Sequence, residues 1–459
     1  MHPVFRAPDG GATPIYLVDA KSFADGRGLA PAALGFARAA GWEPKAGRHL
    51  LLPGEGGGSK LAGVLFGVDA PDAPACDPFG PGRLPGLLPA GTYRFVNAPD
   101  ARLAALAFAL GTYSFGRYRK PDVKTIALAL PDGVDGGDLS RIVEAVFLAR
   151  DLINTPTNDM GPAELENAVR NVARQHDAKV TSIVGDDLLR ENFPLIHAVG
   201  RASALAPRLI DLTWGDTSDP RVTLVGKGVC FDSGGLDIKP SSGMLMMKKD
   251  MGGAATVLAA AHMIMSRGLK LRLRVLIPAV ENAISGSAFR PLDVYPSRRG
   301  LTVEVGNTDA EGRLILADAL ALADEEAPDL LVDLGTLTGA ARVALGPELP
   351  AFYTNNDALA AELLALGQQE NDPFWRLPLW QPYLSMLDSK VADTNNVSSG
   401  GFAGSITCAL FLSRFVSVTK AWLHFDIYAW NAAAKPGRPE GGECQIARAL
   451  YAHLCKRYA

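Results

Sequence analysis

One stretch of the sequence indicates the fold class. Residues 221–280 read RVTLVGKGVC FDSGGLDIKP SSGMLMMKKD MGGAATVLAA AHMIMSRGLK LRLRVLIPAV. The apolar run at 221–225 predicts a buried strand, the alanine-rich segment 251–267 predicts a helix, and 271–280 predicts a second strand. Strands that alternate with helices of this length are typical of a largely parallel sheet with helices on both faces.

The same alternation continues on both sides of this stretch. Towards the C-terminus the patterns predict three strands and two helices, and 139–155 has helical apolar spacing followed by Pro156, which we interpret as a helix joining two domains. The first 135 residues alternate as well. Their predicted elements are strands at 14–19, 60–68 and 124–130, helices at 31–41 and 101–111, and breaker-rich loops at 52–59 and 69–91. The predicted C-terminal elements are strands at 302–305, 330–334 and 421–427 and helices at 314–326 and 445–454.

These patterns predict an α/β protein of two domains. A small N-terminal α/β domain occupies residues 1–135, a linker helix and turn occupy 136–160, and a larger α/β domain occupies 161–459. The larger domain is expected to have a central, mostly parallel sheet covered by helices. Any chemistry is expected there, because the first domain carries no obvious reactive motif.

Composition excludes several classes of protein. The chain has 459 residues, of which 48% are hydrophobic and 20% charged, so it is not intrinsically disordered. A net charge of −4 gives no global attraction to nucleic acid or to an anionic membrane. No stretch approaches the roughly 18 to 20 apolar residues of a membrane span, and the N-terminus lacks signal-peptide features. Five scattered cysteines without a C-x-x-C pair argue against a disulfide framework, and we expect a cytoplasmic protein.

Two loops that follow predicted strands are rich in carboxylates. The first, 226–253, contains Asp232 and Asp250, and the second, 306–314, contains Asp309 and Glu311. In an α/β sheet such loops surround the ligand crevice. Four converging carboxylates repel one another unless cations neutralise them, and two metal ions about 3.5–4 Å apart do so. The sequence is therefore compatible with a two-metal centre.

Simpler interpretations exist for each of these residues. The loop segments resemble ordinary turns, and Asp250 is placed to cap the helix that follows it. Lys227 and Lys239, which lie among the acids, are either salt-bridge partners or deprotonated amines, and spacing alone does not separate these states. The lone His262 is interpreted as a satisfied core or surface histidine, which argues against a zinc hydrolase of the H-E-x-x-H kind.

Two motifs together resemble the leucine aminopeptidase (cytosol aminopeptidase) family of dinuclear metallopeptidases. Residues 307–314, Asn-Thr-Asp-Ala-Glu-Gly-Arg-Leu, are similar to the signature octapeptide of that family, and 227–253 matches its other characteristic segment in order and spacing. Residues 335–340 and 401–415 also resemble family segments. The similarity covers about residues 145–455, and in the first 135 residues we recognise no motif.

The resemblance implies a catalytic apparatus. One ion would be held by Asp309 and Glu311 with Asp232 bridging, and the second by Lys227, as a neutral amine, and Asp250, with Asp232 and Glu311 shared. The two divalent ions would be zinc or manganese, with magnesium or cobalt also compatible. A water or hydroxide bridging the ions would attack the peptide. By the same resemblance, Lys239 would polarise the scissile carbonyl and Arg313 would hold a bicarbonate that relays the proton.

The resemblance also implies a substrate and an assembly. Short peptides with a free N-terminus would lose an N-terminal leucine or a similar aliphatic residue, in a homohexamer whose N-terminal domains serve assembly or access. Where the family has Ala-Gly, this chain has Tyr428-Ala429, and a tyrosine there would narrow the pocket or point elsewhere. Plain core packing is the alternative role for Met247. The residues that would line the pocket are Met247, Thr336, Leu337, Gly339 and Tyr428.

Two rival functions belong to other classes. A dinuclear phosphoesterase would also use clustered carboxylates, but the two lysines and Arg313 suit amide hydrolysis better. Some relatives of the family bind DNA through surfaces that involve the N-terminal domain. Runs of basic residues interleaved with aromatics are not evident here, so nucleic acid is not an expected partner. The basic residues considered are Arg83, Arg94, Arg102, Arg117, Arg119 and Lys120.

Overall fold

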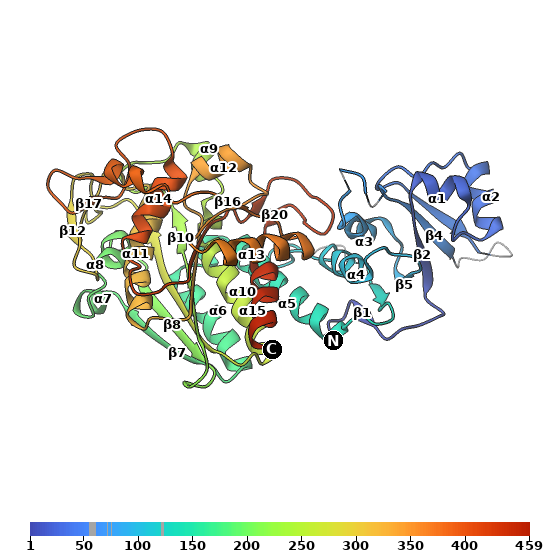
Figure 1. Ribbon diagram of the computed structural model, residues 1–459, viewed down its shortest axis with the longest axis horizontal. Helices are drawn as coiled ribbons and strands as arrows, with labels where there is room; N and C mark the ends of the chain where they lie inside the picture. The colour runs from blue at the N-terminus through green and yellow to red at the C-terminus, as the bar shows by residue number, and fades with distance from the viewer. Residues whose placement is uncertain (55–60, 71, 75, 121–123) are drawn as a thin grey trace. The chain divides into compact units, whose positions relative to one another are not determined.

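The computed structural model describes residues 1–54, 61–70, 72–74, 76–120 and 124–459. The chain forms two compact units, drawn together in Figure 1. The first comprises residues 1–147 and 432–440, and the second comprises 148–431 and 441–459. Helix α5 (Gly136–Asn154) contains the boundary between them, which agrees with the helix predicted at 139–155.

The first unit is built on a six-stranded sheet with the order β1-β6-β5-β2-β4-β3. Its strands pair in parallel except β3, which runs antiparallel to β4. The predicted helices at 31–41 and 101–111 are confirmed as α2 and α4. The elements of this unit are β1 (Phe5–Arg6), β2 (Thr13–Val18), α1 (Ala20–Asp25), α2 (Pro31–Ala39), β3 (His49–Pro53), β4 (Leu61–Gly67), η2 (Gly80–Arg83), α3 (Leu84–Leu87), β5 (Gly91–Phe95), α4 (Ala101–Leu110) and β6 (Ile126–Ala129).

The interpretation of 69–91 as a loop is wrong over its second half. The segment contains two short helices, η2 and α3, and it ends where β5 begins. Tertiary packing outweighs the breaker residues here. A Cβ atom on Gly82 would lie 2.3 Å from the backbone nitrogen of Gly437, so this glycine permits a close approach that a larger residue would block. Some predicted elements lie partly outside the described residues. These are the loops at 55–59, 71 and 75, and the strand 60–68 at its first residue.

The second unit is built on a nine-stranded sheet with the order β16-β15-β18-β14-β9-β11-β8-β7, to which β10 adds by pairing with β11. The central strands run parallel, as predicted. Antiparallel pairing is confined to the outer strands β7, β8 and β15. The strands are β7 (Lys179–Val184), β8 (Arg208–Trp214), β9 (Arg221–Gly226), β10 (Gly228–Asp232), β11 (Arg272–Asn282), β14 (Leu330–Gly335), β15 (Ala351–Tyr353), β16 (Trp375–Arg376) and β18 (Trp422–Asp426).

Helices cover both faces of this sheet. Helix α10 packs with α6 and α15 against one face, and α11 packs with α8 and α14 against the other (Figure 1). A Cβ atom on Gly253 would lie 2.2 Å from the carbonyl oxygen of Leu334, so this glycine lets α10 approach β14 closely. The helices are α6 (Pro162–Gln175), η3 (Thr157–Asp159), α7 (Asp187–Arg190), α8 (Pro194–Gly200), α9 (Ser241–Met244), η4 (Met247–Met251), α10 (Gly252–Arg267), α11 (Glu311–Glu325), α12 (Gly339–Leu345), α13 (Asp357–Gln369), η5 (Gln381–Leu387), α14 (Gly404–Ser413) and α15 (Ala447–Tyr458).

Short strands complete the second unit. β12 (Val294–Pro296), β13 (Thr302–Glu304) and β17 (Thr394–Asn395) form one small sheet, and β19 (Trp430–Asn431) and β20 (Gly441–Gly442) form another. None of the helices in the part of the chain that the structure describes has the length and apolar character needed to cross a membrane.

Candidate metal centre

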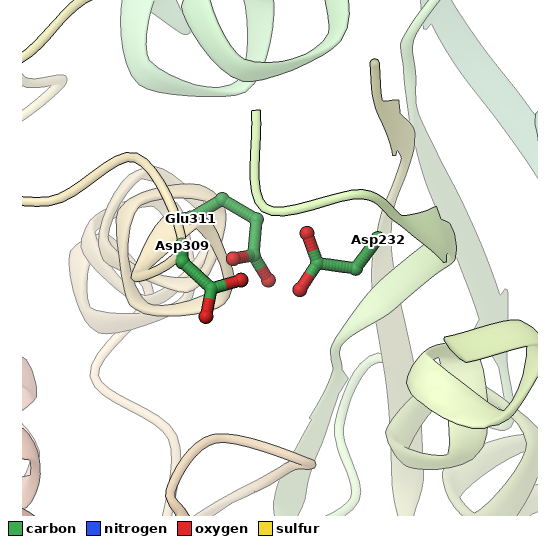
Figure 2. Close-up of side chains that lie close together, drawn as sticks. All are labelled: Asp232, Asp309 and Glu311. Carbon is green, nitrogen blue, oxygen red and sulfur yellow. The ribbon is translucent and has the colours of Figure 1, made fainter. Parts of the chain in front are cut away.

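Three carboxylates from two segments of the second unit converge. Asp232 is the last residue of β10, Glu311 is the first residue of α11, and Asp309 lies in the loop just before that helix. One carboxylate oxygen from each lies within 4.8 Å of the others. Figure 2 shows the three side chains pointing toward one another. The convergence predicted from the two loops is therefore confirmed for these residues.

Asp232 is held by groups that follow neighbouring strands. The side-chain nitrogen of Asn282, at the end of β11, donates a 2.8 Å hydrogen bond to Asp232 Oδ1. The backbone N–H of Gly234 donates to the same oxygen at 2.9 Å. Gly234 has a φ of +88°, which a residue with a side chain rarely adopts. With Oδ1 fixed in this way, Oδ2 faces the carboxylate cluster.

Lys227 lies at the buried base of the cluster. Its Nζ is 2.7 Å from Asp250 Oδ2, 3.0 Å from Glu311 Oε1 and 2.8 Å from the carbonyl oxygen of Thr336. Burial opposes the charged form, but the nearby carboxylates outweigh it and raise the pKa of this lysine above its ordinary value. A Cβ atom on Gly312 would lie 2.7 Å from Lys227 Nζ, so the glycine of the octapeptide makes room for the amine.

Asp250 does not cap the following helix. The N-terminal cap residue of α10 is Met251, and no side chain accepts a capping hydrogen bond there. Asp250 Oδ1 instead accepts a 2.7 Å hydrogen bond from the Thr336 hydroxyl. Burial acts to raise the pKa of Asp250, but Lys227 and Lys249 outweigh it and hold that pKa below its usual value. The capping interpretation is therefore wrong, and Asp250 is instead paired with Lys227 and Thr336.

Lys239 lies on the more open side of the cluster. It forms ion pairs with Asp232 Oδ2 at 2.9 Å and with Asp309. Its side chain is 15% exposed, whereas that of Lys227 is 3% exposed. Burial again opposes the charged form, and the Asp232 carboxylate outweighs it and raises the pKa of Lys239. A molecule entering the site could therefore reach Lys239 but not Lys227.

The electrostatics of the cluster fit a divalent cation. Burial, reinforced by neighbouring carboxylates, raises the pKa of Asp232 to about 6 and that of Glu311 to about 8. Glu311 Oε2 is buried and has no hydrogen-bond partner among the described residues. A buried carboxylate oxygen without a partner is costly, and a hard cation removes that cost by coordination. The donors present, carboxylate oxygens and one amine, suit Mg²⁺, Mn²⁺ or Zn²⁺.

The other residues named from the sequence lie around this cluster in the same unit. Arg313 is buried on α11 and donates a 2.7 Å hydrogen bond to the carbonyl oxygen of Asn396. Met247 begins η4, the short helix that contains Asp250. The segment after β14 is fixed by Asp426, whose Oδ1 accepts from the backbone N–H of Leu337 at 3.0 Å, and Gly339 begins α12 directly after it.

Tyr428 is fixed through its backbone and flanked by cations. Gln445 Oε1 accepts hydrogen bonds from the N–H groups of Tyr428 and Ala429, at 3.0 and 2.9 Å. Ala429 has a φ of +57°, a strained conformation for a non-glycine residue, where the family pattern has glycine. Lys249 Nζ lies 4.5 Å from the centre of the Tyr428 ring, and Arg342 Cζ lies 5.2 Å from it.

Several residues of the site were not identified from the sequence. Asn282 is the last residue of β11 and Asp426 is the last residue of β18, so a polar side chain at the end of a strand is the available signal. Lys249 gave no signal, because a lysine in a glycine- and serine-rich loop is typical of a solvated surface. His262 was interpreted as a satisfied histidine, and its Nδ1 lies 2.9 Å from Nε2 of His176.

Comparisons with known proteins cover both units. A family model described as the cytosol aminopeptidase family, catalytic domain, matches residues 147–451. A second, the M17 aminopeptidase N-terminal domain, matches 14–131, a region that carries no motif recognisable from the sequence alone. Peptidase B of Pectobacterium carotovorum is 43% identical over 324 residues, which are 68% of this chain and 74% of that protein.

Solved structures also match this chain over nearly its whole length. The crystal structure of a cytosol aminopeptidase from Coxiella burnetii has a TM-score of 0.94 and 46% identity, with 99% of this chain and 100% of that chain covered. The bottromycin maturation enzyme BotP, in complex with Mn, has a TM-score of 0.87 and 33% identity, with 97% and 99% covered.

Proposed function

Because this chain belongs to the cytosol aminopeptidase family, it is a metal-dependent aminopeptidase, and we propose that it removes N-terminal leucine or a similar aliphatic residue from short peptides. One observation supports this proposal most strongly. Two lysines lie in one carboxylate cluster, and Lys227 is buried at its base while Lys239 is partly open. This asymmetry matches the distinct roles that the family resemblance gives them.

Five side chains would hold the two divalent ions. Asp309 and Glu311, with Asp232 bridging, would hold the ion in the more open position. Lys227 and Asp250, with Asp232 and Glu311 shared, would hold the ion in the deeper one. When bound, the ions would supply an activated water and positive charge beside the scissile carbonyl. Lys227 would act there as a neutral amine, so loading releases a proton from it. Zinc or manganese is the proposed metal, with magnesium or cobalt compatible.

Lys239 and Arg313 would act on the substrate. The Lys239 ammonium can stabilise negative charge that develops on the carbonyl oxygen, because it is a cation preset by Asp232 and Asp309. Arg313, directed by its hydrogen bond to Asn396, would hold a bicarbonate that moves the proton towards the leaving amine. Both roles are carried over from the family through the octapeptide and the 227–253 segment.

The substrate would be selected by its free amine and its first side chain. A neutral α-amine would be a ligand of the deeper ion, whereas an acylated amine would not, so N-terminally blocked peptides should be rejected. The side chain would enter a pocket lined by Met247, Thr336 and Tyr428, with Leu337 and Gly339 beside them. We also propose a homohexamer acting in the cytoplasm, on the strength of the family resemblance.

Hydrolysis of leucyl-p-nitroanilide tests the proposed function. The protein is dialysed against a chelator and assayed before and after Mn²⁺ or Zn²⁺ is added, and N-acetyl-leucyl-p-nitroanilide is the matched control. We expect activity to return with metal on the free-amine substrate alone. Equal cleavage of both substrates would overturn the role of the free amine, and failure to cleave any N-terminal residue in a panel, with either metal, would overturn the proposed function.

A further inference from the structure

A buried asparagine outside the family motifs is bonded to the loop that carries Asp309. Asn396 directly follows β17, and its exposed fraction is 0%. Its side-chain Oδ1 accepts hydrogen bonds from the backbone N–H groups of Gly306 and Asn307, at 2.7 and 3.3 Å. Its Nδ2 donates to the carbonyl oxygens of Asn307 and Ala310, at 2.8 and 3.3 Å. One side chain is therefore bonded to both ends of this loop.

The Asn396 amide uses its whole hydrogen-bonding capacity on this loop. A side-chain amide has two N–H donors and an oxygen with two lone pairs, and all four are occupied here. The amide also adds no charge close to Asp232, Asp309 and Glu311, whose carboxylates already repel one another. A carboxylate at this position would lose both donors and increase that repulsion. A neutral amide is thus well suited to holding a loop beside an acidic cluster.

Asp309 takes its position from this loop rather than from a helix or a strand. Within the loop, Asn307 Oδ1 accepts a 2.7 Å hydrogen bond from the backbone N–H of Asp309. Lys239 pairs with the Asp309 carboxylate, but Lys239 lies in a loop as well. The Asp309 side chain is 32% exposed, whereas that of Glu311, on α11, is 2% exposed. The position of Asp309 therefore depends on what holds its loop.

The segment that contains Asn396 approaches the loop closely. A Cβ atom on Gly306 would lie 2.4 Å from Asn395 Oδ1, so the glycine permits this approach. The backbone carbonyl oxygen of Asn396 accepts the 2.7 Å hydrogen bond from Arg313, and its backbone N–H donates to the carbonyl oxygen of Glu304 at 3.0 Å. These two bonds do not involve the Asn396 side chain. A substitution there can therefore test the support of the loop separately from the support of Arg313.

We propose that Asn396 is a positioning residue of the metal centre, whose amide holds Asp309 where it binds the more open ion. The inference rests on the proposed function, in which Asp309 is a ligand of one ion only and the other four ligands lie outside this loop. Loss of the amide should therefore weaken the binding of one ion and leave the other near its wild-type affinity. Groups that orient metal ligands typically change metal affinity by about 10- to 100-fold.

Manganese binding to the metal-free protein tests this inference. Wild-type and Asn396→Ala proteins are titrated with Mn²⁺ by equilibrium dialysis, and electron paramagnetic resonance reports whether two bound ions are close enough to be spin-coupled. In Asn396→Ala we expect one Kd near its wild-type value and the other raised about 10- to 100-fold, so that the coupled signal requires more Mn²⁺. Wild-type affinity for both ions, or an equal loss for both, would overturn the inference alone. A wild-type protein that binds a single ion would overturn the dinuclear centre and the inference with it.

A matched control separates positioning from general stability. In the first unit the Asn97 side chain also holds a backbone segment, because it accepts from the N–H of Leu17 and donates to its carbonyl oxygen, at 2.8 Å in both cases. Asn97→Ala should lower the urea midpoint of unfolding without changing either Mn²⁺ affinity. If Asn396→Ala does not fold, Asn396→Ser is titrated instead, because the shorter serine side chain cannot reach both ends of the loop. Two wild-type affinities in the folded serine variant would then overturn the inference.

Discussion

Replacing Asn282 by alanine should weaken metal binding although all of the proposed metal ligands stay in place. The Asn282 side chain is buried and donates hydrogen bonds to Asp232 Oδ1 at 2.8 Å and to the carbonyl oxygen of Thr308 at 3.1 Å. The first orients the shared carboxylate, and the second ties β11 to the octapeptide loop. Alanine removes both and leaves Asp232 Oδ1 with the Gly234 N–H alone.

The expected losses of stability and of Mn²⁺ affinity follow from the two hydrogen bonds that the alanine removes. A hydrogen bond to a charged group contributes about 1.5–3 kcal/mol and a neutral one about 0.5–1.5 kcal/mol, so the metal-free protein should lose about 2–4.5 kcal/mol of unfolding free energy. The charged contact also stabilises the ionised form of Asp232, so its loss raises a pKa that burial already places at about 6. Since metal must displace that proton, we expect Mn²⁺ affinity to fall about 10- to 100-fold.

The assay is competition for Mn²⁺ between the protein and a fluorescent chelator at fixed pH, together with urea unfolding of the metal-free forms. The control is Asn356→Ala, which removes an N-terminal cap hydrogen bond to Leu359 on α13 and should lower stability by about 1 kcal/mol without changing Mn²⁺ affinity. Wild-type Mn²⁺ affinity in a folded Asn282→Ala protein would contradict this expectation and would show that other groups orient Asp232.

Three other changes give distinct signatures. Glu311→Ala removes a carboxylate proposed to hold both ions, so both metal loading and turnover should be lost. Metal analysis after dialysis and peptide hydrolysis measure the two losses, and full metal loading would contradict this expectation. Lys239→Ala should lower kcat by about 10²- to 10³-fold while the bound metal content stays near that of wild type, and an unchanged kcat would remove its proposed role. Burial raises the pKa of Asp318 from 3.8 to about 7. The native state therefore holds this proton more tightly than the unfolded chain does. About 4 kcal/mol of unfolding free energy is lost as the pH rises from 4 to 7. In chelator, Asp318→Asn should therefore flatten the fall of unfolding free energy over that range, and an unaltered slope would show that other groups cause it.

Much of the fold could be predicted because its signals are local. The apolar strand at 221–225, the alanine-rich helix that follows it and the strand ending near Val280 are continuous patterns, and all three lie in the second unit as expected. The short helices at 80–87 could not be predicted, since their stability depends on packing such as the contact of Gly82 with Gly437. The assignment of 432–440 to the first unit likewise has no local signal.

Some residues of the site could likewise be predicted from the sequence, and others could not. Asp232, Asp309 and Glu311 lie in glycine-rich loops after strands, a pattern that predicts convergence, and the structure brings them together. The environment of Lys249 could not be predicted, because its burial depends on Tyr428, which is distant in the sequence. Such long-range contacts decide whether a lysine is a solvated surface group or a buried one.

The most direct test of the dinuclear centre is a crystal structure of the manganese-loaded protein with anomalous diffraction measured at the manganese edge. We expect two peaks about 3.5–4 Å apart, one among Asp232, Asp309 and Glu311 and the other beside Lys227 and Asp250. A single peak, or peaks away from these five side chains in an active preparation, would contradict it.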